Sequence, residues 1–85
     1  MFADYLQEFA VVAQRQDMSL AAAELGLSTS SLARHMASLE AELRAHLLER
    51  GASGVHLTED GRYALSVAQK VSELGRSLER ELKNA

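Results

Sequence analysis

The sequence predicts a mainly α-helical domain with a three-helix core, a small β-hairpin and a long C-terminal helix. Two short helical segments meet at Gly26, apolar residues around them recur at helical spacing, and a glycine-containing turn separates two short apolar runs. Because 85 residues suffice for one small domain, we expect residues 1–62 to form the domain and residues 63–85 to form a linker or dimerisation helix.

The first two helices are defined by apolar spacing and by polar breaks. A helix is predicted over residues 2–15, and Asp17 or Ser19 is suited to cap a short second helix. That helix should end at Gly26, because glycine adopts positive φ at low steric cost where a chain reverses. The first helix carries its apolar residues at Tyr5, Leu6, Phe9, Val12 and Ala13.

A third helix is predicted from near Ser28 to about Leu43. Ser28 or Thr29 can cap its first turn through a side-chain oxygen. Together with the second helix and Gly26 it forms a helix-turn-helix, whose second helix usually enters the DNA major groove. Four apolar residues at spacings of four, three and four predict one buried face, namely Leu32, Met36, Leu39 and Leu43.

After the third helix the pattern changes to two short apolar runs. Residues 47–50 and 55–57 are predicted to pair as a hairpin around the turn at 51–54, and Thr58 is expected to cap the last helix. That helix carries a heptad-like seam, which predicts pairing with a second copy; the alternative is that it folds back on its own domain. The predicted dimerisation residues are Ala64, Leu65, Ala68, Val71, Gly75, Leu78 and Leu82.

The charge distribution bears on nucleic-acid binding. The net charge of −3 argues against the simplest basic footprint, yet residues 27–39 contain no acid and hold Arg34 and His35. The chain has no cysteine, its histidines lack metal-ligand spacing, and no Ser/His/Asp arrangement is implied, so we expect no cofactor, metal site or catalytic activity. No signal peptide or membrane-spanning run is visible, which predicts a cytoplasmic protein without membrane contact.

The order of elements resembles the N-terminal domain of LysR-type transcriptional regulators, from about Tyr5 to the end of the chain. The resemblance implies a winged helix-turn-helix that binds double-stranded DNA, forms a homodimer through the last helix, and in most members precedes a large effector-binding domain. Family habit favours an excised domain over a natural stand-alone protein. The matching residues are Leu6, Phe9, Val12, Ala13, Ala21, Ala22, Leu25, Ser28, Leu32, Arg34, Leu39, Glu40, Glu42, Leu43, Leu47, Glu49, Arg50, Leu57, Thr58, Glu59 and Gly61.

Several predicted DNA contacts have a structural alternative. Arg34 can grip guanine or a phosphate, or pair with Glu24. Ser28 is favoured as a helix cap over a DNA contact. His35 can contact the DNA backbone or be a solvated helix residue, and Arg50 can hold a phosphate or form an ion pair with a nearby carboxylate. The predicted DNA-binding residues are Ser28, Thr29, Ser30, Ser31, Ala33, Arg34, His35, Arg50, Ser53 and His56.

These residues support two hypotheses. The first is a dimeric, sequence-specific DNA-binding regulator of transcription, with the third helix in the major groove of a pseudo-palindromic site. The alternative is an anti-activator type of protein-interaction module that has lost DNA binding. The family commonly has Gln, Pro and Ser where this chain has Thr29, Ser30 and Ala33, and its wing is normally rich in arginine, which favours the alternative.

Overall fold

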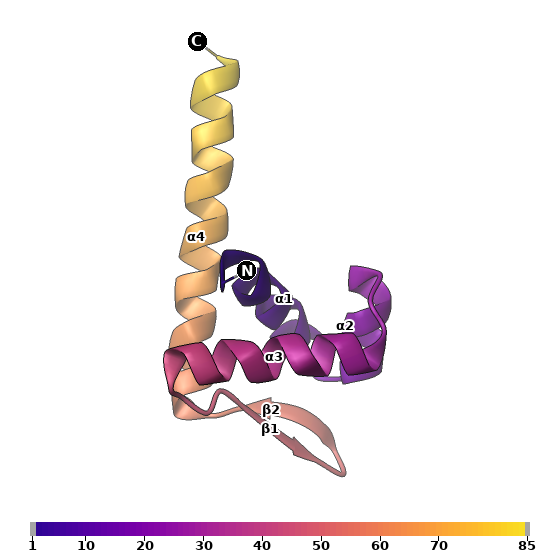
Figure 1. Cartoon of the computed structure of the whole chain (residues 1–85). Coiled ribbons are helices and arrows are strands. Elements are labelled where there is room, and N and C mark those ends of the chain that lie inside the picture. Colours follow the sequence, from indigo (N-terminus) through magenta and orange to yellow (C-terminus); the bar gives the residue numbers. More distant parts are fainter. Residues whose placement is uncertain (1, 85) are drawn as a thin grey trace.

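The computed structural model describes residues 2–84. Figure 1 shows α3 lying across α1 and α2, the hairpin beneath α3, and α4 projecting away from the other elements. The predicted winged helix-turn-helix with a long C-terminal helix is confirmed. The elements are α1 (Phe2–Arg15), α2 (Met18–Leu25), α3 (Thr29–Leu43), β1 (Leu48–Gly51), β2 (Gly54–Leu57) and α4 (Glu59–Lys83).

Side-chain caps set the helix boundaries. Asp17 caps α2, because its Oδ1 accepts a hydrogen bond from the Leu20 backbone N–H at 2.8 Å, so Ser19 is not the cap. Gly26 ends α2 with φ of 69°, as its position in the sequence predicts. Thr58 caps α4 in the same way as Asp17 caps α2, accepting from the Gly61 N–H at 3.0 Å.

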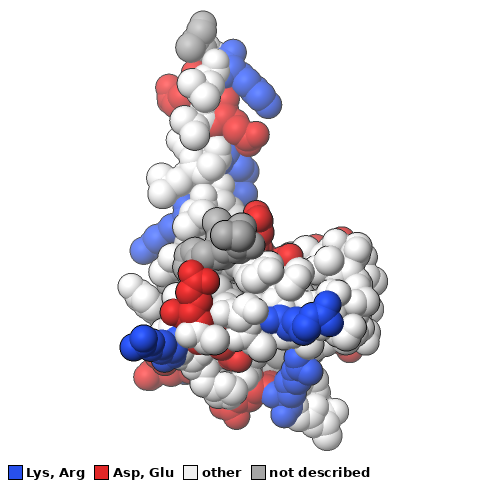
Figure 2. Space-filling view, viewed as in Figure 1, with Lys and Arg blue, Asp and Glu red and all other residues white. Residues whose placement is uncertain are grey.

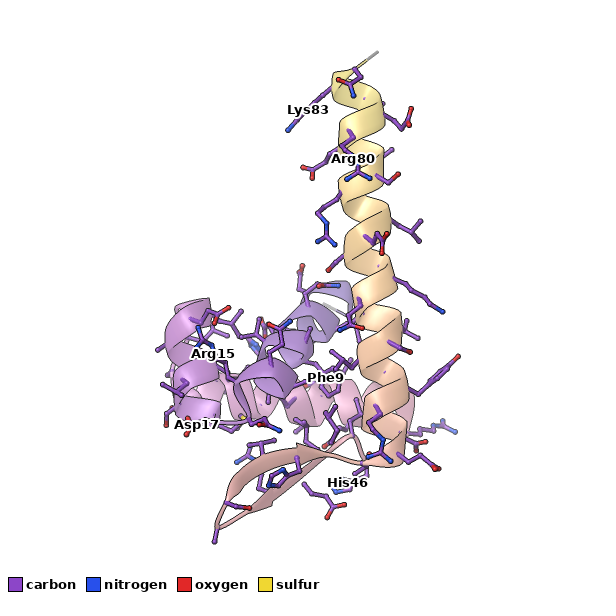
Figure 3. The ribbon with its side chains drawn as sticks, turned by 180° about the vertical axis from the view of Figure 1, so that it is seen from behind. Phe9, Arg15, Asp17, His46, Arg80 and Lys83 are labelled. Atoms are coloured by element: carbon purple, nitrogen blue, oxygen red, sulfur yellow. The ribbon has the colours of Figure 1, made fainter. Side chains whose placement is uncertain are left out.

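The core lies where the four helices meet one another and the base of the hairpin, and α2 contributes Met18, Ala21 and Ala22 to it. Phe9 is labelled near the centre of the domain in Figure 3 and is fully buried, as are Leu32 and Leu39 of α3. Leu43 was predicted on the same buried face but is 39% exposed. It occupies the last turn of α3, directly before Arg44 reverses the chain in a left-handed conformation, so no element covers it fully.

The hairpin is a two-stranded antiparallel sheet with Leu48 opposite Leu57 and Gly51 opposite Gly54. The strands reach one residue further into the turn than the sequence predicts, which leaves Ala52 and Ser53 as the connection. The buried side chains of Leu48 and Val55 face the core.

The hairpin is also fastened to the loop between α1 and α2. The Val55 N–H donates to the backbone oxygen of Gln16 at 3.1 Å, and Gln16 itself has a positive φ of 56°. A Cβ on Gly54 would lie 2.5 Å from that same oxygen, so only glycine fits there. Backbone geometry therefore holds the wing against the helix-turn-helix.

The first half of α4 belongs to the domain. Ala64 and Ala68 are buried in this chain's own core, Ala68 completely, so the prediction that they line a seam between two copies is wrong for these residues. Leu65 also packs against this core. Helical spacing places Ala64, Leu65 and Ala68 on one stripe with Val71. The first three residues pack on the core of this domain, whereas Val71 is exposed. The predicted boundary at residue 62 falls inside the first turn of α4.

The second half of α4 projects from the domain, and Arg80 and Lys83 lie far from the three-helix core in Figure 3. Leu78 and Leu82 are 60% and 69% exposed, and Leu74 and Val71 are exposed as well. An apolar stripe thus remains uncovered within the described part of the chain. No helix among residues 2–84 is long and apolar enough to cross a membrane.

Candidate nucleic-acid interface

The first turn of α3 carries a cluster of hydroxyl groups. Ser28 Oγ accepts a hydrogen bond from the Ser31 N–H at 3.1 Å and donates to Ser31 Oγ at 3.0 Å. It also lies 3.3 Å from Ser30 Oγ. Ser28 therefore acts as the helix cap that its position favours, and Thr29 and Ser30, which are exposed like Ser28, do not cap the helix.

Arg34 is exposed one turn further along the same helix. Its Nη2 donates to Ser31 Oγ at 3.2 Å, which orients the guanidinium toward the start of α3. The alternative partner, Glu24, instead accepts from Arg15 Nε at 2.6 Å. Within residues 2–84 no carboxylate pairs with Arg34, so its remaining N–H groups are available to an anionic partner.

His35 was predicted to contact DNA or to be solvated, and the structure places it elsewhere. Its ring stacks on Tyr5 of α1 with centroids 4.3 Å apart, and its Nδ1 lies 2.8 Å from Glu8 Oε1. The side chain is only 25% exposed and faces α1, where it contacts Tyr5 and Glu8. The sequence contains a signal for this position, because His35 follows buried Leu32 by three residues and precedes buried Leu39 by four.

The wing contributes polar side chains beside α3. Arg50 is exposed and makes no ion pair within the described residues, so the predicted alternative for it is not formed. Ser53 Oγ lies 3.0 Å from His56 Nε2 at the tip of the hairpin. Figure 2 shows separate basic patches over α3 and over the hairpin, whose only Lys or Arg residues are Arg34 and Arg50.

An open groove of about 460 Å³ separates α3 from β1. Small side chains of α3, Ala33 and Ala37, form one wall, and Arg50 lies on the opposite wall.

Glu40 forms the base of this groove, a role that the sequence did not reveal. Its Oε2 accepts from the N–H groups of Leu47 and Leu48 at 2.7 and 3.1 Å, and His46 Nδ1 lies 3.5 Å away. The carboxylate thereby fixes the chain where it enters β1. Glu40 and Glu49 place two negative charges on the groove. Arg50 is the only Lys or Arg among the residues that line it.

The described residues bring together Ser28, Thr29, Ser30, Ser31, Ala33 and Arg34 on α3, with Arg50, Ser53 and His56 on the wing; His35 is excluded. Among residues 2–84 no group of three or more His, Cys, Asp or Glu side chains is placed to hold a metal ion. The site is thus a polar, weakly basic surface.

Comparison with known proteins identifies relatives of the whole arrangement. Residues 3–62 match the family described as bacterial regulatory helix-turn-helix protein, lysR family. A probable hydrogen peroxide-inducible genes activator of Mycobacterium xenopi is 41% identical over 68 residues, which are 80% of this chain and 36% of the relative. The transcriptional regulator TcbR of Pseudomonas sp. strain P51 is 41% identical over 88% of this chain and 26% of its own length. This chain therefore spans about a third or less of these relatives.

Solved structures match the wing and α4 as well as the core. The crystal structure of the CbnR DNA-binding domain with DNA has a TM-score of 0.88 and 38% identity, covering 99% of this chain and 98% of that chain. The complex of the BenM DNA-binding domain with catB site 1 DNA has a TM-score of 0.92 and 30% identity, covering 99% of this chain and 93% of that chain. Nearly the entire described fold is thus shared with domains that were crystallised on DNA.

Proposed function

Because the chain belongs to the lysR family of bacterial regulatory helix-turn-helix proteins, we propose that it is the sequence-reading DNA-binding domain of a transcriptional regulator. The observation that carries the proposal is the exposed first half of α3, where Arg34 has no carboxylate partner among the described residues. Similarity to domains solved on DNA supports it.

In this proposal α3 enters the major groove. Thr29, Ser30 and Ala33 meet base edges, since a hydroxyl can donate or accept there and a methyl group can contact a thymine methyl. Arg34 grips guanine O6 and N7 or a phosphate, and its bond to Ser31 holds it near the first turn. Arg50 contacts the backbone beside the groove, while Ser53 and His56 extend from the wing tip toward the minor groove.

We further propose that two copies pair through the exposed stripe of α4 and bind two half-sites of a pseudo-palindrome. The stripe consists of Val71, Gly75, Leu78 and Leu82, widened by Leu74. Pairing would remove these side chains from water, which provides the driving force. A regulator of this kind acts where its DNA is, which supports the predicted cytoplasmic location, and the surface suits binding without catalysis.

The test is binding of the protein to random-sequence and genomic duplexes by mobility shift. Arg34→Ala should weaken half-site binding by about tenfold or more, the range expected when a good base contact is lost. Arg15→Ala is the charge-matched control, since it removes a cation whose only described partner is Glu24. Equal loss in both variants would mean that net charge, not the α3 surface, determines affinity.

Salt dependence provides a second measurement. If Arg34 and Arg50 of both protomers each neutralise one phosphate, four contacts predict a slope near −3.6 and about a 150-fold loss of affinity between about 50 and 200 mM salt. The alternative, a protein-interaction module, is favoured by the net charge of −3 and by a wing with Arg50 as its single Lys or Arg. A folded dimer that retains no duplex at the lower salt concentration would refute DNA binding and direct the search to a protein partner.

A further inference from the structure

The side chain of Gln7 connects α1 to α4 through both ends of its amide. Its Nε2 donates to the backbone oxygen of Ala68 at 3.3 Å, and its Oε1 accepts from Ser72 Oγ at 2.5 Å. Both bonds are partly buried and join residues 61 and 65 positions apart in the sequence. They are the described side-chain hydrogen bonds between these two helices.

These bonds lie at the point where α4 leaves the domain. Ala68 is the last fully buried residue of the helix, and nearly every residue after Ser72 is exposed. In Figure 1 the helix continues beyond this point as a projecting arm. The direction of the arm relative to α3 is therefore set where the first half of α4 contacts α1 and the base of the hairpin.

Apolar packing and hydrogen bonds constrain this contact differently. Packing of Phe9 and Ala68 is non-directional, and small side chains such as alanine permit neighbouring helices to slide or tilt. A hydrogen bond weakens steeply as its angle departs from linearity, so two bonds one helical turn apart on α4 restrain both tilt and rotation. Between α1 and α4, the two hydrogen bonds of Gln7 are thus the contacts that specify an angle.

We propose that Gln7 and Ser72 are positioning residues that set the distance between the two α3 helices of a dimer, and so the half-site spacing that the dimer accepts. This inference rests on the proposed function. The 11 residues of α4 after Ser72 extend about 17 Å, so a tilt of about 10° moves the end of the helix by about 3 Å. That is close to the rise of one base pair, about 3.4 Å, and the twofold axis doubles it.

The experiment measures affinity for duplexes whose two half-sites are separated by the selected spacer or by spacers shortened and lengthened by one and two base pairs. For the original protein we expect a clear optimum. Gln7→Leu and Ser72→Ala, singly and together, should reduce the preference for the optimal spacer by about fivefold, the factor equivalent to one net hydrogen bond. Affinity for a duplex with one half-site should be unchanged, because α3 and the wing are untouched.

Two control variants separate the angle from stability in general. Gln69→Leu changes an exposed residue of α4 beside the same joint and should leave the spacer profile as it was. Ser72→Thr keeps the hydroxyl donor and should restore the profile that Ser72→Ala loses. Circular dichroism at the assay temperature establishes that each variant is folded.

The outcomes are distinct. An unchanged spacer profile in Gln7→Leu and Ser72→Ala, with normal half-site binding, would overturn the inference and leave the proposed function intact. A parallel loss of half-site binding and of thermal stability in both variants would also overturn it, because the bonds would then stabilise the domain without setting the spacing. Failure of the original protein to bind any half-site would instead refute the proposed function.

Discussion

Replacing Gly61 with alanine should destabilise the domain although the position is helical. A Cβ at Gly61 would lie 2.1 Å from the Leu47 backbone oxygen, 3.1 Å from the Leu47 carbonyl carbon and 3.3 Å from Leu57 Cδ2. The first distance falls more than 1 Å short of ordinary contact, and the obstacle is backbone, so α4 and the start of the wing must separate. The same oxygen accepts a hydrogen bond from the Thr58 N–H at 3.0 Å, which that movement would weaken.

The magnitude follows from three contributions. Overpacking at a well-packed site costs about 1–3 kcal/mol, and loss of one hydrogen bond costs about 1 kcal/mol. Alanine gains about 1 kcal/mol over glycine in helix propensity, which offsets part of this. The net loss is about 2 kcal/mol, equivalent to a fall in melting temperature of about 8–16 °C for a domain of this size.

Gly75→Ala is the matched control for this measurement. It lies in the same helix, and an added Cβ would have no heavy atom within 4 Å, so helix propensity alone should raise the melting temperature by about 4–8 °C. Because Gly75 lies on the proposed dimer stripe, melting by circular dichroism is followed at two protein concentrations. Equal stabilisation by Gly61→Ala and Gly75→Ala would refute the steric argument.

Three further predictions concern the interface and the dimer. Glu40→Ala should destabilise the domain in urea by about 1–3 kcal/mol, because two N–H groups at the base of the wing lose their acceptor, and Glu40→Gln, which keeps an oxygen, should cost less. His35→Ala should lower the free energy of unfolding by about 1–2 kcal/mol, because the stack on Tyr5 and the bond to Glu8 are lost. Half-site affinity, measured by mobility shift, should stay the same. A selective loss of affinity would show that His35 belongs to the interface. Leu78→Asp should yield a folded monomer in sedimentation analysis, and a persistent dimer would show that the stripe does not pair the copies.

The sequence predicted most helix boundaries because local chemistry determines them. Asp17, Gly26 and Thr58 act at their own positions, through a side-chain oxygen or a permitted φ, and need no distant partner. The hairpin was found for the same reason, since its turn is encoded by glycines close together in the chain. The family's fold follows from these local signals in their order.

The misplaced residues depend on contacts between elements. Helical spacing showed that Ala68 and Leu78 share a stripe but could not show that α1 covers the first and leaves the second exposed. His35 was assigned by residue type, although its spacing from Leu32 and Leu39 marks an inward position. Glu40 anchors the wing only because Arg44 turns the chain back toward α3, a consequence of tertiary structure.

The backbone bond between Val55 and Gln16 has a consequence for the thermodynamics of DNA binding. The hydrogen bond joins the second strand of the wing to the loop before α2, so the wing is already ordered in the free protein. DNA binding then carries no entropic cost for ordering the wing. The Val55 amide should exchange its hydrogen slowly with solvent, while the amides of Ala52 and Ser53 exchange fast. Only the two-residue tip would then adapt to DNA. Because the distance between α3 and the wing is fixed, the protein would favour DNA whose groove width matches that distance.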